Sequence, residues 1–315
     1  MAARRIGFCL VEGYAMMSTA AAMEPLRAAN LFSDRPLYEI LPLSVAGGPV
    51  RSSLPAAIET RALEAAGSDF DMVFVVAGGE PLRIRDRALY AWLRRMDRLG
   101  VTLGGISGGS AVLARAGLMD NRRFTVHWHH LDELRAMSDG FALERRLYVI
   151  DRDRYTCAGG TAPLDMMHAM ISAEHGAGFA RRISDWFIQT EIRVAEAPQQ
   201  ASIAARYGPL PRAVSEALEL MESHIADPLE LGQIAALVGL SPRQLQRQFA
   251  GAVGMSVIRA YRDIRLGTAR ELLRTSRIRI GEIAQMTGFA TQAAFSEAYR
   301  QRYDEAPRQA RDAGL

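Results

Sequence analysis

The sequence predicts an α/β domain whose parallel sheet is covered by helices on both faces, followed by an all-α domain with two helix-turn-helix units. Three observations support this prediction. Apolar runs alternate with amphipathic stretches over the first part of the chain, which is typical of a parallel sheet. Every segment from Arg212 onward has helical spacing, and the end of the chain contains one helix-turn-helix pattern twice. We therefore place the α/β domain at residues 1–194, a linker at 195–211 and the helical domain at 212–315.

The elements of the α/β domain follow from the period of its apolar residues. Buried strands are expected at the short apolar runs Ile6–Val11, Tyr38–Val45, Met72–Ala77, Val101–Ile106 and Tyr155–Ala158. Helices are expected at Ser18–Asn30, Arg85–Leu99, Pro163–Glu174 and Phe179–Ile192. The stretch Ala195–Pro211 has no clear period and contains three prolines, which indicates a linker.

Composition places the chain among ordinary globular proteins. Of its 315 residues, 49% are hydrophobic and 23% are charged. No apolar run approaches the roughly 18 residues that a membrane span needs, and the apolar stretch near the N-terminus is too short for a signal peptide. The two cysteines, Cys9 and Cys157, are too few for a disulfide framework or a metal cluster. We therefore expect a cytoplasmic protein that does not enter the membrane.

The last part of the chain repeats one pattern of apolar residues and glycine. The first copy consists of Ile234, Ala235, Gly239, Leu245 and Phe249. The second copy consists of Ile283, Ala284, Gly288, Phe295 and Tyr299. The copies are 49 residues apart before the turn and 50 residues apart after it, so the second turn has one extra residue. Two such units at this distance predict binding to double-stranded DNA.

The residues of this pattern suit a helix-turn-helix. Ala235 is small where the second helix crosses the first, and Gly239 tolerates the positive φ of the turn. Ser241 is expected to cap the second helix, and proline follows it. A helix at Ser256–Thr275 would span roughly 30 Å. This length is close to the roughly 34 Å between successive major-groove segments on one face of DNA.

The second helix of each unit carries the residues expected to contact DNA. In the first unit, Leu245 and Phe249 point inward and leave Arg243 and Arg247 on the outer face. Arginine suits guanine edges and phosphates. The complete predicted set is Ser241, Arg243, Gln244, Gln246, Arg247, Thr291, Gln292, Glu297 and Arg300. The charge distribution agrees, because residues 228–303 carry a net charge of +6 and residues 1–210 only +1.

The helical domain resembles the DNA-binding domain of AraC-family transcriptional regulators from about Val214 to Arg311. This resemblance implies RNA polymerase as a further partner. The second unit departs from the family pattern, because Ala293 and Glu297 stand where polar or basic residues are common, and Asp304 stands in place of glycine. Glu297 would repel phosphate or accept a hydrogen bond from a cytosine amino group. We expect the first unit to contact bases and the second mainly to anchor the DNA backbone.

The α/β domain contains a strand, a sharp turn and a helix at residues 101–116, with Ser107 at the elbow. Together with His127 and Trp128, this segment resembles the ThiJ/PfpI branch of class I glutamine-amidotransferase-like domains, over about residues 4–190. The resemblance implies a flavodoxin-like sheet. It also implies where catalytic residues of hydrolytic members would lie: a cysteine at the elbow, a histidine base and an acid from the first loop.

This chain departs from the hydrolytic pattern. Ser107 replaces the cysteine, and Met17 and Ser18 occupy the place of the acid. Without an orienting acid a Ser–His pair is a poor catalyst, so we expect no catalytic residues and no enzyme activity. The alternative is a DNA-tethered, Ser-dependent amidase or related hydrolase, in which Ser107 attacks a carbonyl and His127 is its base.

A ThiJ/PfpI-like domain fused to an AraC-type domain is the arrangement of the GlxA family of transcriptional regulators. Residues 23–30 and 157–165 look like the subgroup that senses amino-acid-like or quaternary-amine metabolites such as arginine, betaine or carnitine. The resemblance implies a ligand-responsive activator of a catabolic operon that dimerises through its α/β domain. No cofactor is expected, and no metal, because no third ligand at metal spacing accompanies His129 and His130.

The effector pocket is expected at the carboxyl ends of the strands, where open α/β sheets bind ligands. The predicted ligand-binding residues are Tyr14, Glu80, Ser107, Ser110, His127 and Trp128. Glu80 could pair with a cationic group, and Tyr14 or Trp128 could offer an aromatic face. The backbone amides of the elbow could hold a carboxylate.

Overall fold

The structure is a computed structural model that describes residues 2–138, 140–200, 207–276 and 278–312. The chain divides into two compact units, an N-terminal unit of residues 1–199 and a C-terminal unit of residues 200–315. Each unit has its own hydrophobic core, and each is described separately. No helix in the described ranges is both long and apolar enough to cross a membrane.

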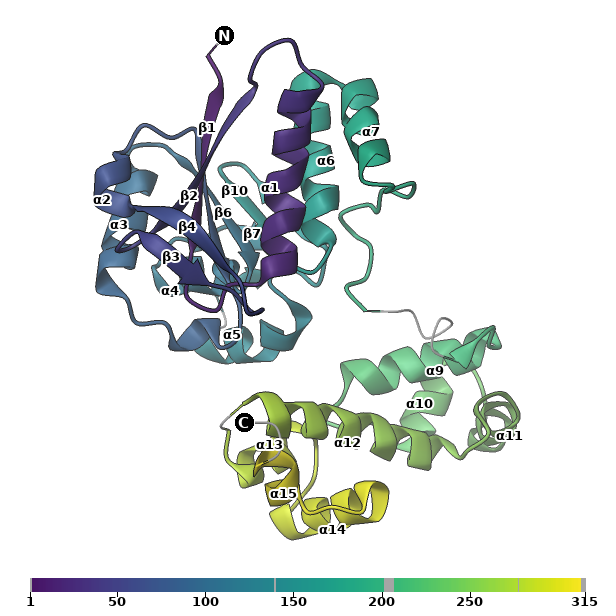
Figure 1. The fold of residues 1–315 in the computed structure, drawn as a ribbon. Coiled ribbons are helices and arrows are strands. Elements are labelled where there is room, and N and C mark those ends of the chain that lie inside the picture. Colours follow the sequence, from purple (N-terminus) through teal and green to yellow (C-terminus); the bar gives the residue numbers. More distant parts are fainter. Residues whose placement is uncertain (1, 139, 201–206, 277, 313–315) are drawn as a thin grey trace. The chain divides into compact units, whose positions relative to one another are not determined.

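The N-terminal unit is built on an eight-stranded sheet with the order β3-β4-β2-β1-β5-β6-β10-β9 (Figure 1). Its strands are β1 (Arg4–Leu10), β2 (Tyr38–Ser44), β3 (Gly48–Arg51), β4 (Ala57–Ala62), β5 (Met72–Ala77), β6 (Thr102–Ser107), β9 (Tyr148–Asp151) and β10 (Arg154–Cys157). The strands from β4 to β10 pair in parallel, and β3 and β9 add antiparallel edges. The central order β2-β1-β5-β6-β10 is the flavodoxin-like order, as the sequence predicted.

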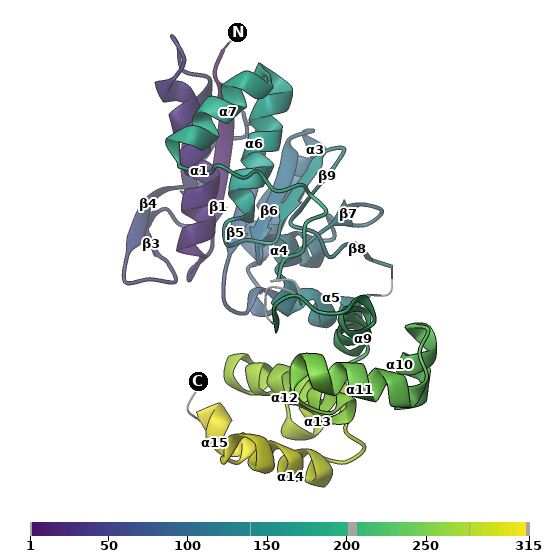
Figure 2. The same cartoon turned by 90° about the vertical axis from the view of Figure 1, so that its right-hand side faces the viewer.

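Helices cover both faces of this sheet, which confirms the predicted layers (Figures 1 and 2). One face carries α1 (Met16–Leu31), α6 (Ala162–His175) and α7 (Ala177–Trp186). The other face carries α2 (Leu63–Ala66), α3 (Arg87–Arg98), α4 (Gly109–Arg115) and α5 (Leu131–Met137). The apolar stripe of α3, with Leu93 at its centre, is fully buried as its period indicates. Shorter elements are η1 (Pro81–Arg83), η2 (Trp128–His130), β7 (Arg123–Phe124) and β8 (Ala142–Leu143).

Two parts of the N-terminal unit differ from the sequence-based expectation. The hairpin of β3 and β4 was not expected, because its exposed, polar strands lack an apolar run. The helix expected at Phe179–Ile192 ends at Trp186, and Ile188 adopts a positive φ of 57°. Beyond it the chain forms an irregular segment, residues 187–199, which we call the strap.

The strap includes the beginning of the segment expected to be a linker. The Leu147 backbone N–H donates to the Ala195 carbonyl over 2.9 Å, and the Gln199 amide donates to the Arg146 carbonyl over 2.7 Å. Residues 195–199 therefore belong to the N-terminal unit. Residues 201–206, in the middle of the expected linker, lie outside the described residues.

The C-terminal unit is helical throughout its described ranges and has two cores. Its helices are α9 (Arg212–Ser223), α10 (Leu231–Leu237), α11 (Pro242–Val253), α12 (Val257–Thr275), α13 (Ile280–Met286), α14 (Gln292–Tyr303) and α15 (Pro307–Asp312). The first core contains buried residues of α9, α10, α11 and the start of α12. The second contains buried residues of α13, α14, α15 and the later part of α12. The long helix α12 thus joins the two helix-turn-helix units, as predicted (Figure 1).

The turn of the second helix-turn-helix is fixed to its surroundings by Arg265 of α12. The guanidinium donates to the carbonyl oxygens of Thr287 and Gly288 over 2.7 and 2.6 Å, and it lies 4.3 Å from the centre of the Phe289 ring. Gly288 itself has a φ of 72°, and a Cβ there would lie only 2.5 Å from Pro228 in the loop that precedes α10. These contacts fix the second turn against α12 and against the loop that precedes α10.

Substitution of the two turn glycines by alanine should have unequal effects on stability. Gly239→Ala introduces only left-handed strain, because its φ is 71° and a Cβ would have open space around it. We expect a loss of about 1–2 kcal/mol. Gly288→Ala adds a steric clash with Pro228, so we expect a loss of about 2–5 kcal/mol. Urea unfolding of both variants tests this difference, and equal losses would contradict the close contact at Gly288.

Candidate functional site

The first recognition helix, α11, begins with a capping box. The Ser241 hydroxyl accepts a hydrogen bond from the Gln244 backbone N–H over 3.3 Å, and the Gln244 side-chain oxygen accepts one from the Ser241 N–H over 2.9 Å. Leu245 and Phe249 are fully buried, as their spacing predicts. The side-chain oxygen of Gln244 is therefore used within the helix, and its NH2 group is the part that faces outward.

The outer face of α11 is basic. Arg243 and Arg247 are exposed, in agreement with the outward orientation predicted from the spacing. Gln246 differs from the expectation, because it is half-buried and its side-chain oxygen is enclosed without a donor among the described residues. Its position follows from the helical period, since it lies one residue after Leu245 and three residues before Phe249, at the edge of the buried stripe. Arg243 and Arg247 are therefore exposed on the outer face of α11, whereas Gln246 packs at the edge of the core.

The second recognition helix, α14, repeats this geometry with different side chains. Residues 291–300 have the same sequence of exposed, half-buried and buried positions as residues 241–250. The Thr291 hydroxyl caps the helix by accepting from the Ala294 N–H over 3.1 Å. The exposed positions that hold Arg243 and Arg247 in the first helix hold Ala293 and Glu297 in the second. Gln292 and Arg300 are also exposed. The two helices are therefore equivalent in shape and unequal in charge.

The elbow at Ser107 has the predicted sharp turn, but its side chain is enclosed. Ser107 has a φ of 57°, in the left-handed region, and only 8% of the residue is exposed. A Cβ at Gly159 would lie 2.7 Å from the Ser107 Cβ, so only glycine permits this contact. Cys157 of β10 pairs with Ile106, the residue before Ser107, and burial raises the pKa of its thiol to about 12. The elbow amides at the start of α4, where a carboxylate contact was expected, do not line the pocket described below.

His127 is oriented as a hydrogen-bond donor. Its Nδ1 accepts a hydrogen bond from the His129 backbone N–H over 3.3 Å. In a neutral imidazole this assigns the proton to Nε2, so the other ring nitrogen is not a free base. At the position of the missing acid, the Ser18 hydroxyl accepts from the Gly160 backbone N–H over 2.8 Å. These contacts favour a structural role over proton transfer.

Besides Ser107, three more of the predicted ligand residues lie outside the pocket. Tyr14 is fully buried, because the unexpected hairpin of β3 and β4 covers it and pairs with it at Ser52. Ser110 is fully buried, and its hydroxyl donates to the Gly105 carbonyl over 3.3 Å. Glu80 is ion-paired with Arg83 over 2.9 Å. None of these three side chains lines the pocket described next.

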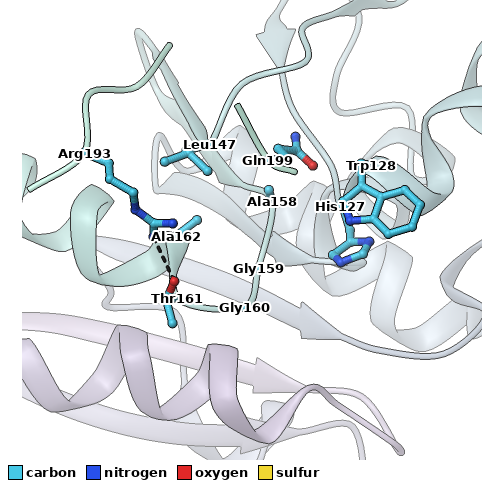
Figure 3. Close-up of a pocket in the computed structure, with 10 residues that line it drawn as sticks. All are labelled: His127, Trp128, Leu147, Ala158, Gly159, Gly160, Thr161, Ala162, Arg193 and Gln199. Carbon is cyan, nitrogen blue, oxygen red and sulfur yellow. Dashed lines mark hydrogen bonds between the residues drawn. The ribbon is translucent and has the colours of Figure 1, made fainter. Parts of the chain in front are cut away.

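A pocket of about 180 Å³ lies where the strap crosses the start of α6 (Figure 3). Of the predicted ligand residues, His127 and Trp128 line it. Its full lining is His127, Trp128, Leu147, Ala158, Gly159, Gly160, Thr161, Ala162, Arg193 and Gln199. Arg193 lies at one end and the rings of His127 and Trp128 lie at the other (Figure 3). Sequence analysis missed Arg193 and Gln199, because Arg193 follows the helix that was expected to end at Ile192 and Gln199 lies in the segment expected to be a linker.

The strap is attached to α6 through the buried carboxylate of Asp165. Its Oδ2 accepts from Nη2 and Nε of Arg193 over 2.6 and 3.0 Å. Its Oδ1 accepts from the Arg193 backbone N–H and from the Gln189 amide, over 2.9 and 3.0 Å. The Asp165 side chain is completely buried, and these four hydrogen bonds use its full acceptor capacity.

A group of histidines borders the pocket. His127, His129 and His130 lie with ring centres 5.2–6.5 Å apart. Burial lowers the pKa of His130 to about 3, with a further contribution from the charges of its two neighbours. Among the described residues, no group of histidine, cysteine and acidic side chains has the geometry to hold a metal ion.

The fold and these surfaces define a class of protein: a helix-turn-helix regulator with an α/β N-terminal unit. The sequence of residues 4–173 matches the DJ-1/PfpI family, and the sequence of residues 234–313 matches a helix-turn-helix domain family. The crystal structure of an AraC family transcriptional regulator from Pseudomonas putida superposes with a TM-score of 0.54 at 27% identity, over 58% of this chain and 99% of that one.

Two relatives extend over nearly the whole chain. The HTH-type transcriptional regulator GlxA of Rhizobium meliloti is 46% identical, over 96% of this chain and 94% of its own length. The HTH-type transcriptional regulator CdhR of Pseudomonas aeruginosa is 38% identical, over 96% of this chain and 90% of its own length. The chain belongs to the GlxA family of transcriptional regulators. This membership assigns it to regulation rather than catalysis.

The depressed pKa of His130 predicts a pH dependence of stability. Between pH 6.5 and about 3, His130 takes up a proton in the unfolded chain but not in the folded one. The free energy of unfolding should therefore fall as pH falls through this window, by up to about 1.4 kcal/mol per pH unit from this residue. In urea unfolding, His130→Phe should show a shallower loss below pH 6.5 than the unmodified protein. Parallel pH profiles would contradict the prediction.

Proposed function

We propose that the protein is a cytoplasmic, effector-controlled transcriptional regulator that binds operator DNA through α11 and α14. The observation that carries this proposal is that the two recognition helices expose and bury equivalent positions. Each helix packs on its own core, and α12 contributes to both cores. A single helix-turn-helix needs a second copy to contact two grooves, whereas two units joined by one helix can contact both. The pocket of the N-terminal unit supplies a place for the effector.

The unequal charges of the two helices indicate different tasks. Arg243 and Arg247 are exposed on the first helix and suit bidentate contacts with guanine or phosphate. The NH2 group of Gln244 can donate to a base edge beside them. In the second helix, Arg300 and Gln292 suit phosphate contacts, while Glu297 disfavours them unless it accepts from cytosine. The hydroxyls of Ser241 and Thr291 cap their helices, at ends where phosphate is favoured.

The pocket has room for a small effector. A cavity of about 150 Å³ holds benzene, so about 180 Å³ accommodates a small metabolite. His127 offers a donor and Trp128 an aromatic face. The family resemblance supports an amino-acid-like or quaternary-amine effector, activation of a catabolic operon, a homodimer formed by the N-terminal units and RNA polymerase as partner.

Ser107→Ala should leave effector binding and effector-dependent transcription within about twofold of the unmodified protein. The reason is that the Ser107 side chain is enclosed against Gly159 and does not line the pocket. A reporter assay and a hydrolysis assay with small amides measure the two properties. Loss of a hydrolytic rate together with loss of regulation would instead support the amidase.

Arg243→Ala should weaken binding at one base position by about 1–3 kcal/mol and relax specificity there. Glu297→Gln should instead strengthen binding to all sequences, because it removes an exposed negative charge from the DNA-facing side. Binding titrations against a selected duplex and its single-base variants measure both effects. Uniform weakening by Arg243→Ala across all variants would mean that Arg243 contacts only phosphate.

A further inference from the structure

The pocket has two chemically different ends. Arg193 and the first residues of α6 form one end, and Trp128 and His127 form the other (Figure 3). None of the described residues that line it is acidic. A ligand that is only cationic would therefore find no carboxylate here, whereas an anionic group has a guanidinium to meet. Because Arg193 is already paired with Asp165, it offers an anionic ligand its remaining N–H donors rather than an uncompensated charge.

Arg193 is held in place with part of its donor capacity unused. Nε and Nη2 donate to Asp165, and Nη2 also donates to the Thr161 hydroxyl over 2.8 Å. No described residue accepts from Nη1. The side chain is 36% exposed although its partner carboxylate is completely buried. A fixed guanidinium with two free N–H donors is suited to bind a carboxylate without reorganising.

The position of the pocket also suits an anionic ligand. The pocket lies at the N-terminus of α6, a helix of 14 residues whose dipole favours a negative charge. Gln199 anchors the other end of the strap, because its NH2 group donates to three oxygens, those of the Thr125 hydroxyl and the Val126 and Arg146 carbonyls.

We propose that this pocket binds the carboxylate group of a small effector through the unused N–H donors of Arg193, and that binding tightens the strap against α6. This inference rests on the proposed function, since it concerns the effector of the same regulator. The strap supplies this contact, and the residue after Gln199, where the strap ends, begins the C-terminal unit. Occupancy of the pocket is thereby linked to the point where the chain leaves the N-terminal unit. Such a link regulates DNA binding only if the effector favours one state of the strap.

The first experiment identifies the chemical class with matched probes. Proline, glycine betaine and isobutyrate, each at about 10 mM, are compared with prolinamide, choline and isobutyramide in thermal-shift and calorimetric titrations of the full chain. We expect at least one acid to raise the Tm and to bind at least about tenfold more tightly than its carboxylate-free counterpart. Equal affinity for acid and counterpart would contradict carboxylate recognition.

The second experiment uses variants that keep the fold. Arg193→Gln alone would leave the buried Asp165 carboxylate unpaired, so Asp165→Asn is combined with it. We expect the double variant to lose at least about tenfold in affinity for the acid and none for its counterpart. The control is Glu24→Gln with Arg27→Gln, an exposed ion pair on α1 outside the pocket, and it should bind as the unmodified protein does.

Hydrogen exchange measures the strap directly. The acid should slow exchange of the backbone amides of residues 189–199 in the unmodified protein and not in the double variant. Unchanged exchange with bound acid would overturn the tightening of the strap. Binding that survives in the double variant would overturn the site while leaving the proposed function intact. If none of the three acids binds, this inference is contradicted, whereas the proposed function is contradicted only if no bound small molecule changes the affinity for DNA.

Discussion

The ion pair between Asp165 and Arg193 is the interaction on which the pocket of the N-terminal unit depends. A completely buried carboxylate is unfavourable unless every acceptor site is used, and here two strap residues, Arg193 and Gln189, use all of them. Such a pair contributes little net stability, but losing one partner costs about 3–5 kcal/mol. Its main consequence is therefore positional: it holds an irregular segment across the start of α6, and the space between them becomes the pocket.

A comparable constraint acts in the C-terminal unit. The helix α12 contributes to both cores, and Arg265 and Gly288 fix the second turn against α12 and against the loop that precedes α10. Because the two recognition helices are held by one scaffold, their outer faces can diverge without loss of shape. Glu297 in place of an arginine is an example of this divergence. The result is a pair of DNA-facing helices with equivalent burial and different chemistry.

The sequence predicted most of the fold because its signals are local. Periodic apolar residues identified the central strands and helices, and the repeated pattern located both helix-turn-helix units. The pocket was not predictable in the same way. Arg193 functions through Asp165, 28 residues earlier, and no local pattern records that pairing. Tyr14 was expected at the ligand site because the hairpin that buries it has no apolar run. The enclosed oxygen of Gln246 likewise depends on packing at the edge of a core.

Regulation requires that effector binding change the affinity for DNA. The most direct test is the Kd of the full chain for a duplex selected from a random pool, measured by fluorescence anisotropy with and without a saturating concentration of an effector found by thermal shift. We expect the effector to change this Kd by roughly 5–150-fold, the range of ordinary allosteric coupling. The same Kd with and without bound effector would show that the pocket and the DNA-binding helices act independently, and would contradict effector control.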